Sequence, residues 1–331
     1  MTLFTINLQL FALVNGSVNA TVASGTMGAG AVNDALSPEM KTFYDMTLID
    51  EASPQLVYNQ FGQKRPIPKN GGKTIEFRKF SALPKATTPI QEGVTPAGGA
   101  LEVTKLEATV EQYGYYIVQS DVLELTSLDN TIIEATKLLG KQAGLTLDTI
   151  TRDILMTGLN VSYAGDATSR SAVTANITVA DVVKVVAKLR AANAPTINGD
   201  YVAIIHPYVA HDLMRDPEWI DAHKYAQPEN LYSGEIGKVG GVRFVQTSEA
   251  KIIADGIFLC LFLAEGAYGV TEITGGGLQT IVKQKGSAGT ADPLDQRSSI
   301  GWKAMTTAEI LVPEYMVRYE CKSSFGNVTP N

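Results

Sequence analysis

The stretch Lys73-Thr-Ile-Glu-Phe-Arg-Lys-Phe80 alternates apolar and polar side chains, and a second such run extends from Leu101 to Gln119. Alternation of this kind is typical of β-strands with one buried face. We therefore predict one long β-hairpin from Lys64 to Gln119, with an irregular tip at residues 81–100. A lone two-stranded hairpin is marginal in water, and irregular loops of that length usually have a function. We expect this arm to contact a partner.

The two sides of the predicted hairpin carry opposite charge. The basic residues on the first side are Lys64, Arg65, Lys69, Lys73, Arg78, Lys79 and Lys85, opposed only by Glu76. The acids on and after the second side are Glu92, Glu102, Glu107, Glu111, Asp121, Glu124, Asp129 and Glu134, opposed only by Lys105. Either the two strands neutralise each other, or the charges complement a neighbouring copy of the chain. The sequence leaves both interpretations open.

Composition limits the class of protein. The 331 residues suffice for two compact domains or for one domain with extensions. A net charge of −7 argues against a basic face that grips nucleic acid, although it allows a concave acidic wall that repels nucleic acid. With only two cysteines the chain has no disulfide framework, and Cys260 lies in an apolar run typical of a buried strand.

The first 45 residues are rich in small residues and contain no lysine or arginine before Lys41. We interpret them as an extended arm. The apolar start, Met1 to Val14, lacks the basic region of a signal peptide and is too short to span a membrane. These features predict synthesis in the cytosol and no membrane partner.

Helical spacing recurs after the hairpin. It predicts a helix of roughly 40 Å from Thr131 to about Met156, in which Gly140 and Gly144 lie under a crossing element. Other predicted elements are a short helix at 37–56, a helix from 179 to 189, a helix that begins at Pro207, and strands at 199–205, 241–247, 256–264, 268–273 and within 294–321. The chain is thus expected to be α+β.

Motifs for enzyme chemistry are missing. Lys69-Asn-Gly-Gly-Lys-Thr74 resembles the end of a phosphate-binding loop, but Ile67 replaces the required glycine and a strand follows. The three histidines, His206, His211 and His223, lie among carboxylates without the spacing of a known zinc motif. The Arg215–Trp219 phrase is interpreted as a turn with an anchoring tryptophan. We predict no catalytic residues, no cofactor and no metal site.

Several phrases carry a resemblance to a known family. They are Asn7-Leu-Gln-Leu-Phe-Ala12, His206-Pro-Tyr208, Asp212-Leu-Met-Arg-Asp216, Gly240-Gly-Val-Arg-Phe-Val-Gln-Thr247, Asp292-Pro-Leu-Asp-Gln-Arg297 and Gly301-Trp-Lys303. Together with the order of arm, hairpin, long helix and α/β unit, they resemble the major capsid proteins of tailed phages with the HK97-type fold. The phrases are most similar to the N4-like phage capsid family.

The resemblance implies an HK97-like capsid fold with four parts. These would be an N-terminal arm at 1–45, an E-loop hairpin at 66–115, an axial A-domain at 179–296, and a peripheral P-domain made of 46–65, 116–178 and 297–331, with the long helix as its spine. It implies a non-enzymatic structural protein of the virion, made and assembled in the host bacterial cytoplasm. Pentamers and hexamers would form an icosahedral shell around double-stranded DNA bound without sequence specificity, with separate scaffolding and portal proteins.

This interpretation yields candidate contacts between subunits. They are Lys73, Arg78, Lys79, Lys85 and Glu92 of the hairpin, Phe4, Leu8 and Phe11 of the arm, and Arg215, Trp219 and Arg297 elsewhere. Two alternatives remain at this stage. One is another self-assembling protein, such as a nanocompartment shell or a tail tube, and the other is an α/β hydrolase with the hairpin as a lid.

Overall fold

The computed structural model describes residues 38–52, 55–80, 83, 85–87, 89, 92–93, 98–127, 131–225, 235–287, 292–326 and 328–331. The chain forms two compact units. The first unit consists of Met1–Ser53, Gly114–Ala143 and Leu278–Lys303, and the second unit of Pro54–Tyr113, Gly144–Gly277 and Ala304–Asn331. The long helix α4 (Thr131–Leu155) and the strand β13 (Arg297–Ile310) contribute residues to both.

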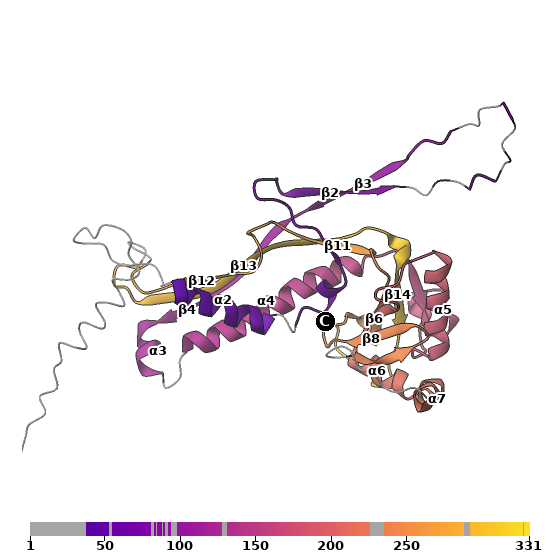
Figure 1. Ribbon diagram of the computed structural model, residues 1–331. Helices are drawn as coiled ribbons and strands as arrows, with labels where there is room; N and C mark the ends of the chain where they lie inside the picture. Colours follow the sequence, from indigo (N-terminus) through magenta and orange to yellow (C-terminus); the bar gives the residue numbers. More distant parts are fainter. Residues whose placement is uncertain are drawn as a thin grey trace, which may run out of the picture. The chain divides into compact units, whose positions relative to one another are not determined.

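A seven-stranded mixed sheet forms the centre of the second unit (Figure 1). Its strand order is β5-β14-β10-β6-β8-β7, and β9 also pairs with β10. The strands are β5 (Val161–Tyr163), β6 (Tyr201–Ile205), β7 (Glu235–Val239), β8 (Val242–Gln246), β9 (Ile252–Ile253), β10 (Ile257–Leu263) and β14 (Met316–Cys321). All seven side chains of β10 are buried, which explains its uninterrupted apolar sequence.

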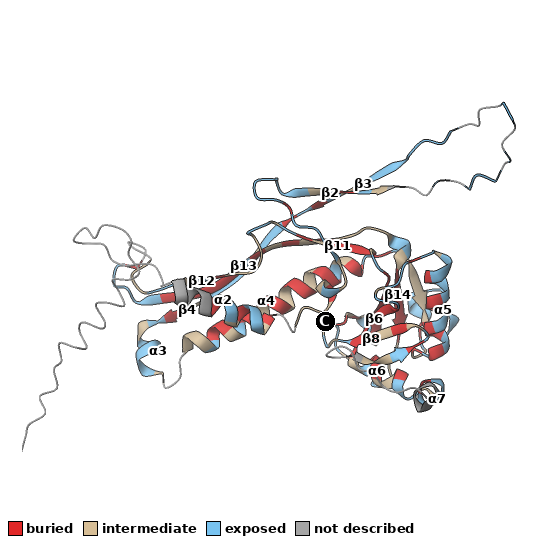
Figure 2. Cartoon of the chain, viewed as in Figure 1, coloured by how far each residue is buried: buried red, intermediate tan, exposed pale blue. Residues whose placement is uncertain are grey.

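Two apolar cores cover the two faces of this sheet, because successive side chains of a strand point to opposite faces. Tyr201, Ala203 and Ile205 pack with the helices α5 (Val179–Ala191), α6 (Pro207–Met214) and α7 (Pro217–Tyr225). Val202 and Ile204 pack on the other face with the end of α4 and with Tyr58. Figure 2 shows these buried positions in red along β6, α4 and α5.

The second unit also includes the hairpin and short connecting elements. The hairpin strands are β2 (Thr74–Phe80) and β3 (Val103–Thr109), and the unit also contains β1 (Gln63–Lys64) and β11 (Tyr268–Glu272). Five 3-10 helices lie at Tyr58–Gln60, Ala164–Asp166, Arg170–Ala172, Ala254–Gly256 and Pro313–Tyr315. β1 pairs in parallel with β11, which pairs with the second half of β13.

In the first unit the first half of β13 lies between β12 (Gln279–Lys283) and β4 (Glu111–Ser120). α3 (Asp121–Thr126) follows β4, and α2 (Pro38–Ala52) crosses α4. A Cβ on Gly140 would lie 2.8 Å from the carbonyl oxygen of Leu48, so the prediction of a crossing element over this glycine is confirmed. The indole Nε1 of Trp302 donates to Oε1 of Gln142 at 2.8 Å, which joins β13 to α4.

The predicted extent of the hairpin was wrong on both sides. The return strand does not continue to Gln119: β3 pairs with β2, whereas β4 pairs with β13. The break falls at Val110, which is buried and donates its backbone N–H to the carbonyl of Lys73 at 2.8 Å. β2 begins directly after Lys73, so it has no further residues with which the return strand can pair, and β4 pairs with β13 instead. Lys64 lies in β1 and not in the hairpin.

The other predicted elements are mostly confirmed. The helices at 131–155, 179–191 and 207–214 and the strands β6, β8, β10 and β11 lie where the sequence placed them. The phrase Arg215–Trp219 is not only a turn, because α7 begins at Pro217 and carries the tryptophan. Within the described ranges no helix is long and apolar enough to span a membrane.

Candidate subunit-contact surfaces

The register of the hairpin separates its side chains into two faces. Phe77 lies opposite Leu106 and Ile75 opposite Ala108, and Lys79 belongs to the same face. Glu76 lies opposite Glu107 and Arg78 opposite Lys105 on the other face. We call the first the inner face and the second the outer face.

The inner face is anchored on the second unit. The Phe77 side chain is 3% exposed, and its ring lies so close to Gly269 that a Cβ there would be 3.1 Å from Cζ. The Arg65 guanidinium lies 5.7 Å from the centre of the same ring, a cation–π distance. Lys79 Nζ lies 3.4 Å from a carboxylate oxygen of Glu314. These contacts fix the base of the hairpin.

The outer face places like charges directly opposite each other, which is unfavourable. This face carries two cations and two carboxylates. Glu76 lies 3.4 Å from Lys105 and 3.8 Å from Arg78, whereas Glu107 makes no ion pair with another described residue. The side chains of Arg78 and Lys105 are 65% and 59% exposed, so these ion pairs contribute little, about 0–1 kcal/mol each. The charges of the outer face balance in number but pair only weakly within the hairpin.

The remaining hairpin candidates are exposed. Lys73 lies just before β2, and Lys85 and Glu92 lie in the tip. None of these three makes an ion pair with another described residue. The outer face and the tip are thus available to a partner.

The other predicted contact residues lie elsewhere. Arg215 is exposed at the end of α6, and Arg297 is exposed at the start of β13, where its backbone N–H donates to Asp292 Oδ2 at 2.8 Å. Trp219 is 5% exposed and packs edge-on against Phe244 at 5.5 Å between ring centroids. Its indole is used in packing within the chain, and a role between subunits stays a prediction. The arm residues Phe4, Leu8 and Phe11 lie outside the described residues.

Sequence reasoning missed an apolar surface in the first unit. Its exposed side chains are Tyr115, Tyr116 and Val118 on β4 and Val122, Leu123 and Leu125 on α3. No residue of α3 is buried, although the helix is capped by Ser120, whose Oγ accepts from the Leu123 N–H at 3.3 Å. The detectable signal was the run from Gln112 to Ser120, which has strand-forming residues and no charge.

The described residues offer little for catalysis. They contain no group of three or more histidine, cysteine or carboxylate side chains placed to hold a metal. His206 caps α6, its Nδ1 accepting from the Tyr208 N–H at 3.1 Å, and burial lowers its pKa. Burial also opposes ionisation of Asp212, but hydrogen bonds from Ser324 and Ser323 outweigh it and lower the pKa.

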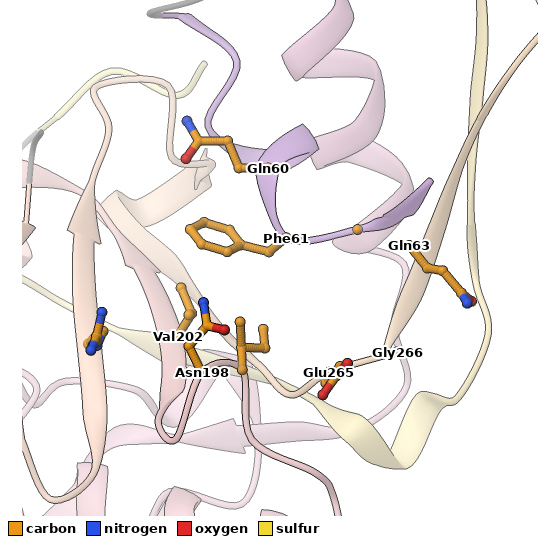
Figure 3. A pocket seen from close by; sticks show the side chains of 10 residues that line it. Gln60, Phe61, Gln63, Asn198, Val202, Glu265 and Gly266 are labelled. Atoms are coloured by element: carbon orange, nitrogen blue, oxygen red, sulfur yellow. The ribbon is translucent and has the colours of Figure 1, made fainter. Parts of the chain in front are cut away.

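A cavity of about 450 Å³ lies in the second unit between Phe61, Asn198 and Glu265 (Figure 3). Its lining combines amide side chains, one carboxylate, Arg243 and apolar groups, without a nucleophile and an adjacent base. The hydrolase alternative therefore receives no support from it.

Comparison with known proteins gives one family and a shared fold. A family model described as phage capsid protein matches residues 103–318. The capsid of Ralstonia phage GP4 is similar with a TM-score of 0.65 at 13% identity, over 93% of this chain and 100% of that chain. The capsid of Cyanophage P-SCSP1u gives a TM-score of 0.63 at 15% identity, over 91% and 94%.

A shell of another kind is also similar. The holo encapsulin complex from Synechococcus elongatus gives a TM-score of 0.56 at 9% identity, over 99% of this chain and 100% of that chain. Among curated proteins none matches. At these identities the structural similarity shows the fold, and the family model adds the class of protein.

Proposed function

Because this chain belongs to the phage capsid protein family and has the HK97-like fold of the capsids it matches, we propose that it is the major capsid protein of a tailed phage. Copies of it assemble as pentamers and hexamers into an icosahedral shell around double-stranded DNA. The observation that carries this proposal is the family match, which spans the hairpin return strand, the long helix and the α/β sheet. The narrower N4-like assignment stays a prediction.

The proposed mechanism is repeated weak association. A contact of roughly 800 Å² per partner is ordinary for proteins, and many such contacts closed by symmetry make a shell far more stable than any pair. Residues 66–115 act as the E-loop, and its outer face, with Arg78 and Lys105, lies on a neighbour's acidic surface. This position offers acidic partners to Arg78 and Lys105, whose exposed ion pairs with Glu76 are weak.

The N-terminal arm and the axial domain are also assigned by the resemblance to HK97-type capsid proteins. Residues 1–45 form the arm that packs under another subunit through Phe4, Leu8 and Phe11, and 179–296 form the axial domain. The chain has no enzymatic role, and its shell is built in the host cytoplasm with scaffolding and portal proteins. DNA contacts the interior without sequence specificity, in keeping with a net charge of −7.

The second candidate is a nanocompartment shell, favoured by the encapsulin similarity over 99% of the chain. Both candidates predict closed particles. They differ in content, because a capsid packages DNA and a nanocompartment packages protein. Nuclease-protected DNA in particles from infected cells favours the capsid, and a protein cargo without DNA favours the alternative.

Electron microscopy of the expressed chain, alone and with its scaffold, tests the proposal. Closed shells are expected, and a stable monomer under both conditions refutes it. The charge contribution is tested by the triple change Lys73→Glu, Arg78→Glu and Lys85→Glu, which leaves the contact of Lys79 with Glu314 intact and should weaken assembly and shift its salt optimum. Lys188→Glu is the control, because this exposed α5 residue makes no ion pair with another described residue. Equal assembly of both variants refutes the charge mechanism.

A further inference from the structure

The outer edge of β4 is a strand edge without a partner. β4 is ten residues long and pairs with β13 on one side, and no strand among the described residues pairs with its other side. Such an edge presents a row of unpaired N–H and C=O groups that can template another strand. The strand is held closely, since a Cβ on Gly301 would lie 2.7 Å from the Cβ of Tyr116. The edge is therefore preformed by its pairing with β13.

This edge lacks the usual protection against pairing. Proteins blunt exposed edges with charged residues, proline or short strands. Apart from Glu111 at its start, β4 contains no charged residue and no proline, and its side chains Tyr115, Tyr116 and Val118 are 55%, 68% and 50% exposed. On the other side of β13, β12 is five residues long and ends in Lys283. The contrast indicates that β4 is kept open for a partner.

The chain itself contains a suitable strand. Phe4, Ile6, Leu8 and Leu10 alternate with the polar residues Thr5, Asn7 and Gln9, a period of two that predicts a strand with one apolar face. No charged side chain occurs before Asp34, so this segment matches the uncharged part of β4, Gln112–Ser120. Residues 11–37 connect it to α2 and could span up to about 90 Å when extended.

We propose that residues 4–10 of a neighbouring copy add to the outer edge of β4 as a further strand. Backbone hydrogen bonds would give this contact its affinity, and the alternate apolar side chains would fix its register against Tyr116 and Val118. The inference rests on the proposed shell, which places copies side by side. A shell requires contacts between subunits. A strand donated by a neighbouring copy provides such a contact, whereas residues 4–10 of the same chain placed on its own β4 would not.

Cysteine cross-linking in assembled shells tests the proposal. The native Cys260 and Cys321 are fully buried, so introduced surface thiols can be read without interference. Subunits carrying Leu8→Cys are mixed with subunits carrying Tyr116→Cys, and the shells are purified, imaged and oxidised with copper phenanthroline. A dimer band on a non-reducing gel is expected from mixed shells. The control replaces Tyr116→Cys by Ile281→Cys on β12 and should give none.

Two further results test whether alternate residues of the donated segment face β4 and whether the segment comes from a neighbouring copy. Ile6→Cys should cross-link to β4 as Leu8→Cys does, while Asn7→Cys should not. Closed shells that give no cross-link, or an equal cross-link from all three positions, overturn the added strand. A chain carrying both thiols that cross-links only within itself overturns the neighbouring donor.

Hydrogen exchange on the wild-type protein does not depend on these variants. The backbone amides of β4 should become protected when free subunits assemble into shells, and unchanged exchange overturns the inference. Failure of the wild-type chain to form shells at all refutes the proposed function, and the inference with it. Intact shells with an open β4 edge refute the inference alone.

Discussion

Asp148 offers the sharpest test of the energetics of this fold. Its side chain is fully buried on α4, and Oδ1 accepts the backbone N–H of Tyr58 at 2.7 Å. Burial raises the pKa of this carboxyl to about 7, against hydrogen bonds from the backbone of residues 57–59 and the charge of Arg152, all of which lower it. The other carboxylate oxygen, Oδ2, has no hydrogen-bond partner in the described chain. The ionised form is therefore costly.

The sign and size of the effect follow from linkage. The folded-state pKa of about 7 lies above the ordinary value of 3.8, so the folded chain binds a proton in a range where the unfolded chain does not. The contribution to stability is fully present below about pH 4 and is lost as the pH rises through 7. With 1.36 kcal/mol per pKa unit, the loss is about 4 kcal/mol. Asp148→Asn removes the charge while its amide oxygen still accepts the Tyr58 N–H.

Urea unfolding of unassembled subunits at pH 5 and pH 8 measures this pH-dependent loss of stability. The wild-type chain should lose more stability than Asp148→Asn between these values, and the variant should be the more stable protein at pH 8. Asp148→Ala is the control, because it removes the acceptor of the Tyr58 backbone N–H and should be destabilised at both pH values. Parallel pH profiles of the wild type and Asp148→Asn would refute the assignment of the raised pKa to this group.

Three other predictions follow from buried contacts. Arg170→Ala should lower the free energy of unfolding by about 2 kcal/mol, since it removes two 2.7 Å hydrogen bonds from the fully buried carboxylate of Glu320 while Arg318 at 3.1 Å still compensates its charge; chemical denaturation at neutral pH measures it. Gly140→Ala should destabilise the chain despite its better helix propensity, because the added Cβ meets the Leu48 carbonyl, and a higher melting temperature would contradict this. Both cysteine thiols should remain unreactive to a thiol reagent until the chain unfolds, and stoichiometric labelling of the native protein would contradict their burial.

The sequence predicted elements well where one period of hydrophobicity dominated. The helix from Thr131 and the fully apolar strand β10 are examples, because their burial requires an unbroken pattern. Gly140 was also interpreted correctly, since small residues in a helix commonly mark a crossing backbone.

Pairing partners were harder to predict, because alternation shows that a segment is a strand and not which strand it pairs with. The run from Leu101 to Gln119 keeps one pattern while its two halves pair with β2 and β13. The apolar surface of α3 and β4 was missed for a related reason. Exposed apolar residues look like core residues in a sequence, and only the structure shows that Leu125 is 81% exposed.

The outer face of the hairpin bears on the question of its partner. Shifting β3 by two residues would bring Arg78 opposite Glu107 and would keep the inner face inward, because side-chain direction repeats every two residues. In the observed register Arg78 and Glu107 are not directly opposite each other. This register is fixed instead by Phe77 on Gly269 and by the bond from the Val110 N–H to Lys73. The charges of the outer face pair only weakly within the hairpin, so they are available to a neighbouring subunit in the proposed shell.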